Sequence, residues 1–469
     1  MKFMHKYIGD KAFYKMLFIL VFPLIIQQGV TNLVNLLDNM MVGALGTAQM
    51  TSVAAVNQLI FVFNLTIFGG ISGASIFGAQ FAGVGDDKGL RETFRFKMYF
   101  SLAVTALAMT VFWLWGDRLV MLFFNNEANR DLDLSVLLGY TRDYFGVMLL
   151  GLLPFAVVQA YAGTLRETGE TFVPMVASVT AIFVNLGFNY LLIFGHFGFP
   201  RLGVRGAAIA TVLSRYVELL IVVLYTHLRS SRFGFIRGAY RSLYVPAHLV
   251  RDIAVTGSPL MFNEVLWSLA MTSITHSYST LGMTAMAAAN ITSTAWNLFC
   301  IIMFAMGTAV SIIVGRELGR GNPDGAKDLA RKLLFVTFAV HIVMGALLVS
   351  CARLIPMLYN TEQIVKDTAA TMLIFAGLMI PMHALVHCIY FTIRSGGKTV
   401  VTFLFDCVFT WVVTAPLAYL LCHFTPLSIA YVYLFVQLSD ALKLFIGIVL
   451  LKRGSWANTV IPTGEKQQA

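Results

Sequence analysis

The chain has 469 residues, of which 58% are hydrophobic and 12% are charged, and its formal net charge is +10. Soluble globular proteins carry about 25% charged residues, so the composition argues against a water-soluble enzyme, a disordered chain and a nucleic-acid-binding module. Five cysteines lie in or beside apolar segments without the spacing of metal ligands. We therefore expect neither a disulfide framework nor a metal site.

Twelve apolar segments are long enough to cross a bilayer, which needs about 20 apolar residues for each helix. We expect them at 14–37, 53–80, 94–115, 134–160, 172–195, 205–227, 252–280, 288–315, 332–352, 367–392, 400–422 and 427–451. Each segment is continuous and lacks the alternation of a barrel strand. The sequence therefore predicts an all-α integral membrane protein with twelve transmembrane helices.

Basic residues indicate the orientation. If both termini lie inside, the inner segments hold 24 of the 33 lysines and arginines, and the outer loops hold six. Cytoplasmic loops carry such an excess in membrane proteins. We expect a multi-pass protein of the cell inner (plasma) membrane with both termini cytoplasmic. Contact with anionic membrane lipid explains the basic balance, and no nucleic-acid partner is needed.

The two halves of the chain repeat each other. An offset of 236 pairs Gly85 with Gly321, and a later offset of 228 pairs LRETGET (165–171) with IRSGGKT (393–399). The predicted organisation is an N-terminal six-helix lobe (1–228), a cytoplasmic linker (229–251), a C-terminal six-helix lobe (252–453) and a cytoplasmic tail (454–469). Pseudo-two-fold symmetry along the membrane normal would relate the lobes, with the substrate site between them. The alternative is a purely structural pseudo-dimer, such as a channel or scaffold.

Carboxylates within spans are functional candidates, because burying them in hydrocarbon is costly. Asp38 ends the first expected span, and Asn32 and Asn35 share its helical face. A carboxylate beside amides suits a proton or Na⁺. The alternative is that Asp38 caps a helix at the outer interface.

Amides in two further spans are candidate cation ligands. Asn185 and Asn189 lie one turn apart in the fifth span, and Gln159 lies in the fourth. Their oxygens are neutral ligands for a cation. Equally, they are typical of hydrogen bonds between neighbouring helices.

The C-terminal half offers a candidate substrate site. Glu264 lies in the seventh span, and Trp267 shares its helical face. An acid beside an aromatic wall suits a lipophilic cation, although a packing hydrogen bond is the alternative. His383 and His387 are four residues apart in the tenth span. They are candidates for proton or substrate contact, and no third metal ligand accompanies them.

Two pairs of opposite charge lie three residues apart within spans. Arg215 precedes Glu218 in the sixth span, and Asp440 precedes Lys443 in the twelfth. This spacing predicts intrahelical ion pairs with a structural role. Asp406 in the eleventh span is a candidate for lining the second lobe.

Catalytic signatures are absent from the sequence. It contains no G-x-x-x-x-G-K-[ST], no G-x-S-x-G and no H-E-x-x-H motif. We therefore expect a protein that is not an enzyme and that has no cofactor apart from transported H⁺ or Na⁺.

Several motifs resemble those of the multidrug and toxic compound extrusion (MATE) family. They are DNMMVGALG after the first span, R-x-x-G-x-T after the fourth and tenth, and GVRGAAIATVLSR opening the sixth. The resemblance covers essentially the whole chain. It implies a monomeric antiporter in which an H⁺ or Na⁺ gradient drives the export of small organic cations, with lobes that rock between outward-open and inward-open states.

The resemblance also implies roles for individual residues. Asp38, Asn185 and Glu264 match the family's first-span acid, fifth-span asparagine and one branch's seventh-span acid. Three positions differ: Gln159 replaces an asparagine, and Asn189 and His383 stand where acids are common. The choice between H⁺ and Na⁺ therefore stays open. A flippase for a lipid-linked or anionic substrate is the second hypothesis, and a membrane enzyme or channel is the third.

Overall fold

The computed structural model describes residues 7–124 and 134–462, and every long regular element in these ranges is a helix. The first half contains α2 (Lys11–Gly43), α3 (Thr47–Val84), α4 (Asp87–Phe124), α5 (Leu134–Met148), η2 (Leu149–Gly151), α6 (Leu152–Glu167), α7 (Phe172–Phe194), η3 (His196–Gly198) and α8 (Gly203–Leu228). After η4 (Gly234–Ile236), the second half contains α9 (Ala247–Ser279), α10 (Met283–Phe299), α11 (Ile301–Gly319), α12 (Pro323–Cys351), η5 (Ile355–Leu358), α13 (Gln363–Ser395), α14 (Thr399–Phe403), η6 (Leu404–Val408), η7 (Thr410–Thr414), α15 (Ala415–Phe424) and α16 (Ile429–Arg453).

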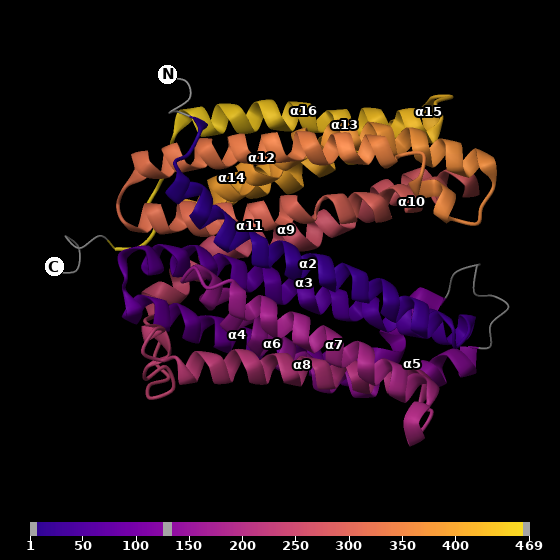
Figure 1. The fold of residues 1–469 in the computed structure, drawn as a ribbon, viewed down its shortest axis with the longest axis horizontal. Coiled ribbons are helices and arrows are strands. Elements are labelled where there is room, and N and C mark those ends of the chain that lie inside the picture. Colours follow the sequence, from indigo (N-terminus) through magenta and orange to yellow (C-terminus); the bar gives the residue numbers. More distant parts are fainter. Residues whose placement is uncertain (1–6, 125–133, 463–469) are drawn as a thin grey trace. The chain divides into compact units, whose positions relative to one another are not determined.

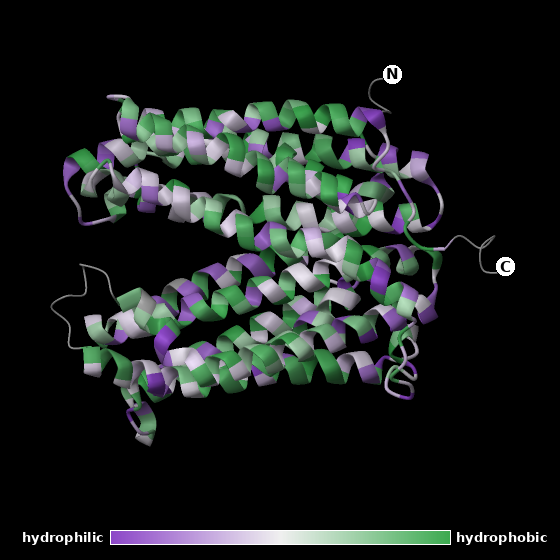
Figure 2. Cartoon of the chain, turned by 180° about the vertical axis from the view of Figure 1, so that it is seen from behind, coloured by the Kyte–Doolittle hydropathy of each residue, from purple (hydrophilic) through white to green (hydrophobic). Residues whose placement is uncertain are grey.

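All twelve expected spans coincide with helical segments, which confirms the predicted fold class. Within the described ranges, eleven helical segments are long and apolar enough to cross a membrane. The seventh expected span, α9, is also long enough at 33 residues, but it carries several polar side chains, including Asn263 and Glu264. Figure 2 shows apolar residues along the helices and hydrophilic residues mainly at the helix ends and in the loops.

Helix boundaries differ from the expected ones. Most helices are longer than the expected apolar segments, because a helix can continue into water beyond the hydrocarbon. Within the expected span 288–315, the regular helix is interrupted at Cys300, between α10 and α11. The expected span 400–422 contains two π-helical segments, η6 and η7.

The described chain forms two compact units. The N-terminal unit contains Ile26–Gly78 and Asp86–Ala254, and the C-terminal unit contains Met1–Ile25, Ala79–Gly85 and Val255–Ala469. In the N-terminal unit, α8 contacts α5, α6 and α7; in the C-terminal unit, α13 contacts α10, α11, α12 and α16 (Figure 1). Residues 1–6 and 463–469, the ends of the expected first lobe and tail, lie outside the described residues.

Glycines repeated in the two halves adopt the same unusual backbone conformation. The φ angles are +74° at Gly85 and +72° at Gly321, and they are +85° at Gly169 and +77° at Gly397. Side chains disfavour this left-handed region, whereas glycine enters it freely. The glycine of R-x-x-G-x-T is thus explained by the turn that ends a helix in each half.

Candidate functional site

Asp38 belongs to a polar cluster inside the N-terminal unit. Asn189 Nδ2 on α7 donates to Asp38 Oδ1 on α2 at 2.6 Å. The Asn185 side-chain amide lies between three groups. One of its two terminal atoms lies 3.0 and 3.1 Å from the two Asp38 oxygens and 3.1 Å from Asn189 Nδ2. The other terminal atom lies 3.2 Å from Thr211 Oγ1 on α8. Helices α2, α7 and α8 therefore converge on one carboxylate.

The Asn185 amide can serve both protonation states of this carboxylate. With Asp38 ionised, the amide nitrogen faces the carboxylate and donates to it, while the amide oxygen accepts from Thr211. With Asp38 protonated, the amide oxygen faces the carboxyl group and accepts a hydrogen bond from its O–H. The Asn185 amide can therefore either donate to the carboxyl group of Asp38 or accept from it, depending on its orientation.

Asp38 does not cap a helix, which corrects the alternative interpretation. Helix α2 continues for five residues beyond Asp38, to Gly43. Asn185 and Asn189 are buried at 5% and 2% exposure, and Asp38 is half-buried. The carboxylate therefore lies on the side of a continuous helix among buried amides.

Gln159 is not joined to this cluster. It is half-buried on α6, and its side chain makes no hydrogen bond with another described residue. The sequence did not single out Tyr144, which is 5% exposed and donates to Asn57 Oδ1 at 3.1 Å. Tyr144 lies within electrostatic range of Asp38, so the polar interior extends from α2 to α3 and α5.

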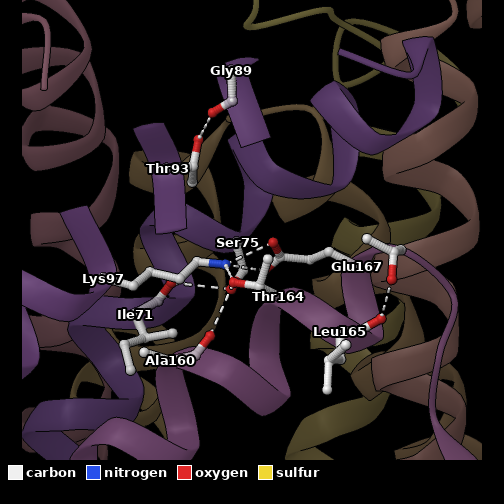
Figure 3. A network of polar contacts seen from close by, with 10 residues as sticks. Ile71, Ser75, Gly89, Thr93, Lys97, Ala160, Thr164, Leu165 and Glu167 are labelled. Carbon is white, nitrogen blue, oxygen red and sulfur yellow. Dashed lines mark hydrogen bonds and ion pairs between the residues drawn. The ribbon is translucent and has the colours of Figure 1, made fainter. Parts of the chain in front are cut away.

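A buried ion pair joins α4 and α6 in the same unit (Figure 3). Lys97 Nζ lies 2.5 and 2.6 Å from the two Glu167 oxygens, and the side chains are 0% and 4% exposed. Thr164 Oγ1 accepts from the same Nζ at 3.2 Å. On α3, a Cβ atom at Gly78 would collide with the Glu167 carboxylate. The sequence alone does not indicate this pair, because Lys97 and Glu167 are 70 positions apart and lie on different helices.

The predicted intrahelical pair on α8 is wrong. Arg215 Nη1 donates to the Gly151 carbonyl oxygen at 3.0 Å, and its guanidinium lies 5.2 Å from the Phe155 ring centre. The Glu218 carboxylate accepts from Ser178 Oγ on α7. Each side chain therefore contacts a helix next to α8, and the two do not pair with each other.

The predicted pair on α16 is wrong as well. Lys443 Nζ contacts Asp406 Oδ1 in η6 at 2.6 Å, and Asn263 Nδ2 on α9 donates to Asp406 Oδ2 at 3.1 Å. His383 Nε2 on α13 lies 3.7 Å from Asp440 Oδ2. Asp406 thus forms an ion pair with a lysine and accepts a hydrogen bond from an amide. It lies in the π-helical segment η6, and such segments are frequent at functional sites.

Glu264 lies next to this C-terminal cluster. It is half-buried on α9, and its carboxylate makes no hydrogen bond or ion pair with another described residue. Arg394 and Asp406 lie within electrostatic range. Trp267, one turn later, is 41% exposed. The candidate acid and its aromatic neighbour are therefore only partly covered within the chain.

The two histidines of α13 have different surroundings. The ring centre of His383 lies 6.4 Å from that of Trp296, in an edge-to-face arrangement. The ring of His387 lies between Phe304 and Phe391, with centres 5.5 and 4.9 Å away. The structure thus places His383 between Asp440 and an indole, and His387 in an aromatic pocket.

Comparison with known proteins identifies the family. A model of the MatE family matches residues 23–191 and 259–420, so that each half of the chain matches it once. The probable multidrug resistance protein NorM of Thermotoga maritima is 22% identical over 95% of this chain and 94% of its own length. The probable multidrug resistance protein YoeA of Bacillus subtilis is 25% identical over 90% of each chain.

Solved structures share the fold. An outward-facing multidrug resistance MATE family transporter of the MOP superfamily aligns with a TM-score of 0.85 at 20% identity, covering 96% of this chain and 97% of its own. The family model matches both halves of the chain, and two relatives match it over 90% or more of their own length, so the chain belongs to the MatE family.

Proposed function

We propose that this protein exports small, amphipathic, mostly cationic organic compounds across the cell membrane, and that inward flow of H⁺ or Na⁺ drives the export. Two curated relatives of nearly the same length are described as probable multidrug resistance proteins. Alternating access between two lobes is the mechanism that the repeated fold supports.

The environment of Asp38 carries the proposal. A carboxylate that forms an ion pair with a lysine is already neutralised without a transported cation. Glu167 and Asp406 are of this kind. Asp38 instead has amide neighbours, and no lysine, arginine or histidine of the described chain forms an ion pair with it. An exchangeable cation completes such a site, because a buried charge needs a counter-charge. Asn185 and Asn189 are then its auxiliary ligands.

Glu264 and Trp267 supply the substrate side of the proposal. A partly covered carboxylate next to an exposed indole attracts an organic cation by charge and by cation–π interaction. His383 and His387, on α13 of the same unit, are proposed to contact the substrate or to relay protons. Arg394 lies within electrostatic range of Glu264, so bound substrate competes with a fixed cation for this acid.

The alternative, a flippase for a lipid-linked or anionic substrate, requires unpaired cations in the interior. In the N-terminal unit, the candidate Arg215 already donates to Gly151 and covers the Phe155 ring. Arg142, an exposed arginine of α5, forms an ion pair with Asp117 at 2.7 Å. Neither of these two cations is therefore free to bind an anionic substrate.

The proposal is tested with purified protein in liposomes that contain a fluorescent lipophilic cation. We expect dye transport when either a pH gradient or a Na⁺ gradient is imposed, and the effective ion identifies the coupling cation. Glu264→Gln should slow transport strongly, whereas Glu362→Gln, at an exposed position before α13, should not. Absence of transport under both gradients would contradict the proposal.

A further inference from the structure

Hydrogen bonds join the segment that follows α8 to the first turns of α4. Arg91 donates to the carbonyl oxygens of Gly234 and Phe235 at 3.1 and 3.2 Å. Arg95, one turn later, donates to those of Gly238, Ala239 and Tyr244 at 2.7–3.1 Å. Tyr99, a further turn along, donates to Leu243 O at 2.9 Å. Residues four apart share a helix face, so one face of α4 fixes the course of residues 234–244.

A pocket of about 820 Å³ lies beside this fixed segment, within the N-terminal unit. This volume is in the range of roughly 300–1,000 Å³ that is typical of ligand sites. Its charged lining comprises Lys88, Arg91, Arg95, Arg237 and Arg241, with Glu92 as the one carboxylate. Within the described chain, none of the five cations forms an ion pair with a carboxylate. An excess of four positive charges therefore surrounds the cavity.

Three of these cations are available to a ligand. Arg91 and Arg95 use their guanidinium groups to hold the loop. Lys88, Arg237 and Arg241 are exposed, and the one hydrogen bond found among their side-chain nitrogens is from Arg237 Nε to Ser230 O at 2.8 Å. Like charges that line one pocket repel one another, and an anion between them relieves the repulsion.

The surroundings favour a lipid as the source of this anion. The pocket lies where α4 begins and α8 ends, and both helices can cross a membrane. Large side chains next to it are exposed, with Leu228 at 81%, Leu243 at 74% and Tyr244 at 68%. Tyrosines and aliphatic side chains beside basic residues are typical of the membrane–water interface. A dissolved phosphate ion needs no such apolar surroundings.

We propose that this pocket binds the phosphate-bearing headgroup of an anionic phospholipid of the inner leaflet, with Lys88, Arg237 and Arg241 as the principal contacts. Basic pockets on the cytoplasmic side of transmembrane helices bind anionic headgroups in this way. The pocket lining includes neither Asp38 nor Glu264, so lipid binding to it is measured without a transport assay.

The test is binding of tail-labelled phosphatidylglycerol to the full-length protein in a neutral detergent, followed by fluorescence polarisation. Unlabelled phosphatidylglycerol should displace the probe, and phosphatidylcholine with the same acyl chains and inorganic phosphate should displace it poorly. The triple variant Lys88→Gln, Arg237→Gln, Arg241→Gln should bind about 100-fold more weakly. The double variant Lys88→Gln, Arg241→Gln keeps the Arg237 hydrogen bond and should show an intermediate loss.

A matched control removes the same charge elsewhere. Arg118→Gln, Arg201→Gln, Arg353→Gln alters three exposed arginines outside the pocket and should bind the probe like the unmodified protein. Equal loss in this control, or unchanged binding in both pocket variants, would overturn the proposed site. Displacement by inorganic phosphate as effective as by phosphatidylglycerol would show a site for free anions and overturn the assignment to lipid.

Discussion

Asp38 and Asp406 are chemically the same group, and their neighbours make them different. Asp406 is neutralised by Lys443 at 2.6 Å, whereas Asp38 is surrounded by the amides of Asn185 and Asn189. The sequence indicated Asn185 and Asn189 as candidate cation ligands, but the amides that it placed beside Asp38 were Asn32 and Asn35. It could not indicate the Lys443–Asp406 pair, because those residues are 37 positions apart and on different helices. Spacing within one sequence segment favoured the closer Asp440 and gave the wrong partner.

Removal of Lys443 should show how much an unpaired Asp406 carboxylate lowers the free energy of unfolding. Lys443→Met leaves a carboxylate without its counter-charge, and we expect a loss of about 3–5 kcal/mol in the free energy of unfolding. Lys443→Met with Asp406→Asn removes both charges and should recover more than half of this loss. Lys452→Met, at an exposed position near the end of the same helix, should have little effect. Denaturant titration in detergent measures all four proteins, and equal losses in the single and double variants would show that the pair is not an electrostatic unit.

Helices were the most predictable elements, because about 20 consecutive apolar residues leave few alternatives in a membrane. Their ends and internal breaks were less predictable. Nothing in the apolar pattern of 288–315 marks the interruption at Cys300, and the π-helical segments beside Asp406 depend on backbone hydrogen bonds that hydropathy does not report. Contacts between helices, such as Gly78 against Glu167, emerge only when α3 and α6 are placed side by side.

A substitution of Gly78 tests how closely α3 must approach α6. A Cβ atom at this position would collide with the Glu167 carboxylate and disturb its pair with Lys97. Gly78→Ala should therefore lower the free energy of unfolding by about 1–3 kcal/mol. Gly139→Ala on α5 is the matched control, because its Cβ would meet open space and alanine favours a helix over glycine by about 1 kcal/mol. Thermal unfolding in detergent should separate the two variants, and equal stability would show that the ion pair tolerates the added methyl group.

At the scale of the whole molecule, the duplication visible in the sequence proved the most informative feature. The offsets of 236 and 228 agree with a family model that matches residues 23–191 and again 259–420. They also agree with paired glycines that share positive φ angles. The sequence could not show that Gln159 stays outside the Asp38 cluster, because that depends on which face α6 presents. The fold is shared by both halves of the chain, whereas the proposed coupling depends on one carboxylate, that of Asp38.

The most direct test of this account compares Asp38→Asn with Asp143→Asn, a control at an exposed position of α5. Both variants are reconstituted in liposomes, and export of a fluorescent lipophilic cation is measured under the gradient that drives the unmodified protein. We expect Asp143→Asn to respond to the gradient normally and Asp38→Asn, although it is folded, not to respond. Export by Asp38→Asn at the rate of the unmodified protein would contradict the claim that this carboxylate carries the coupling cation.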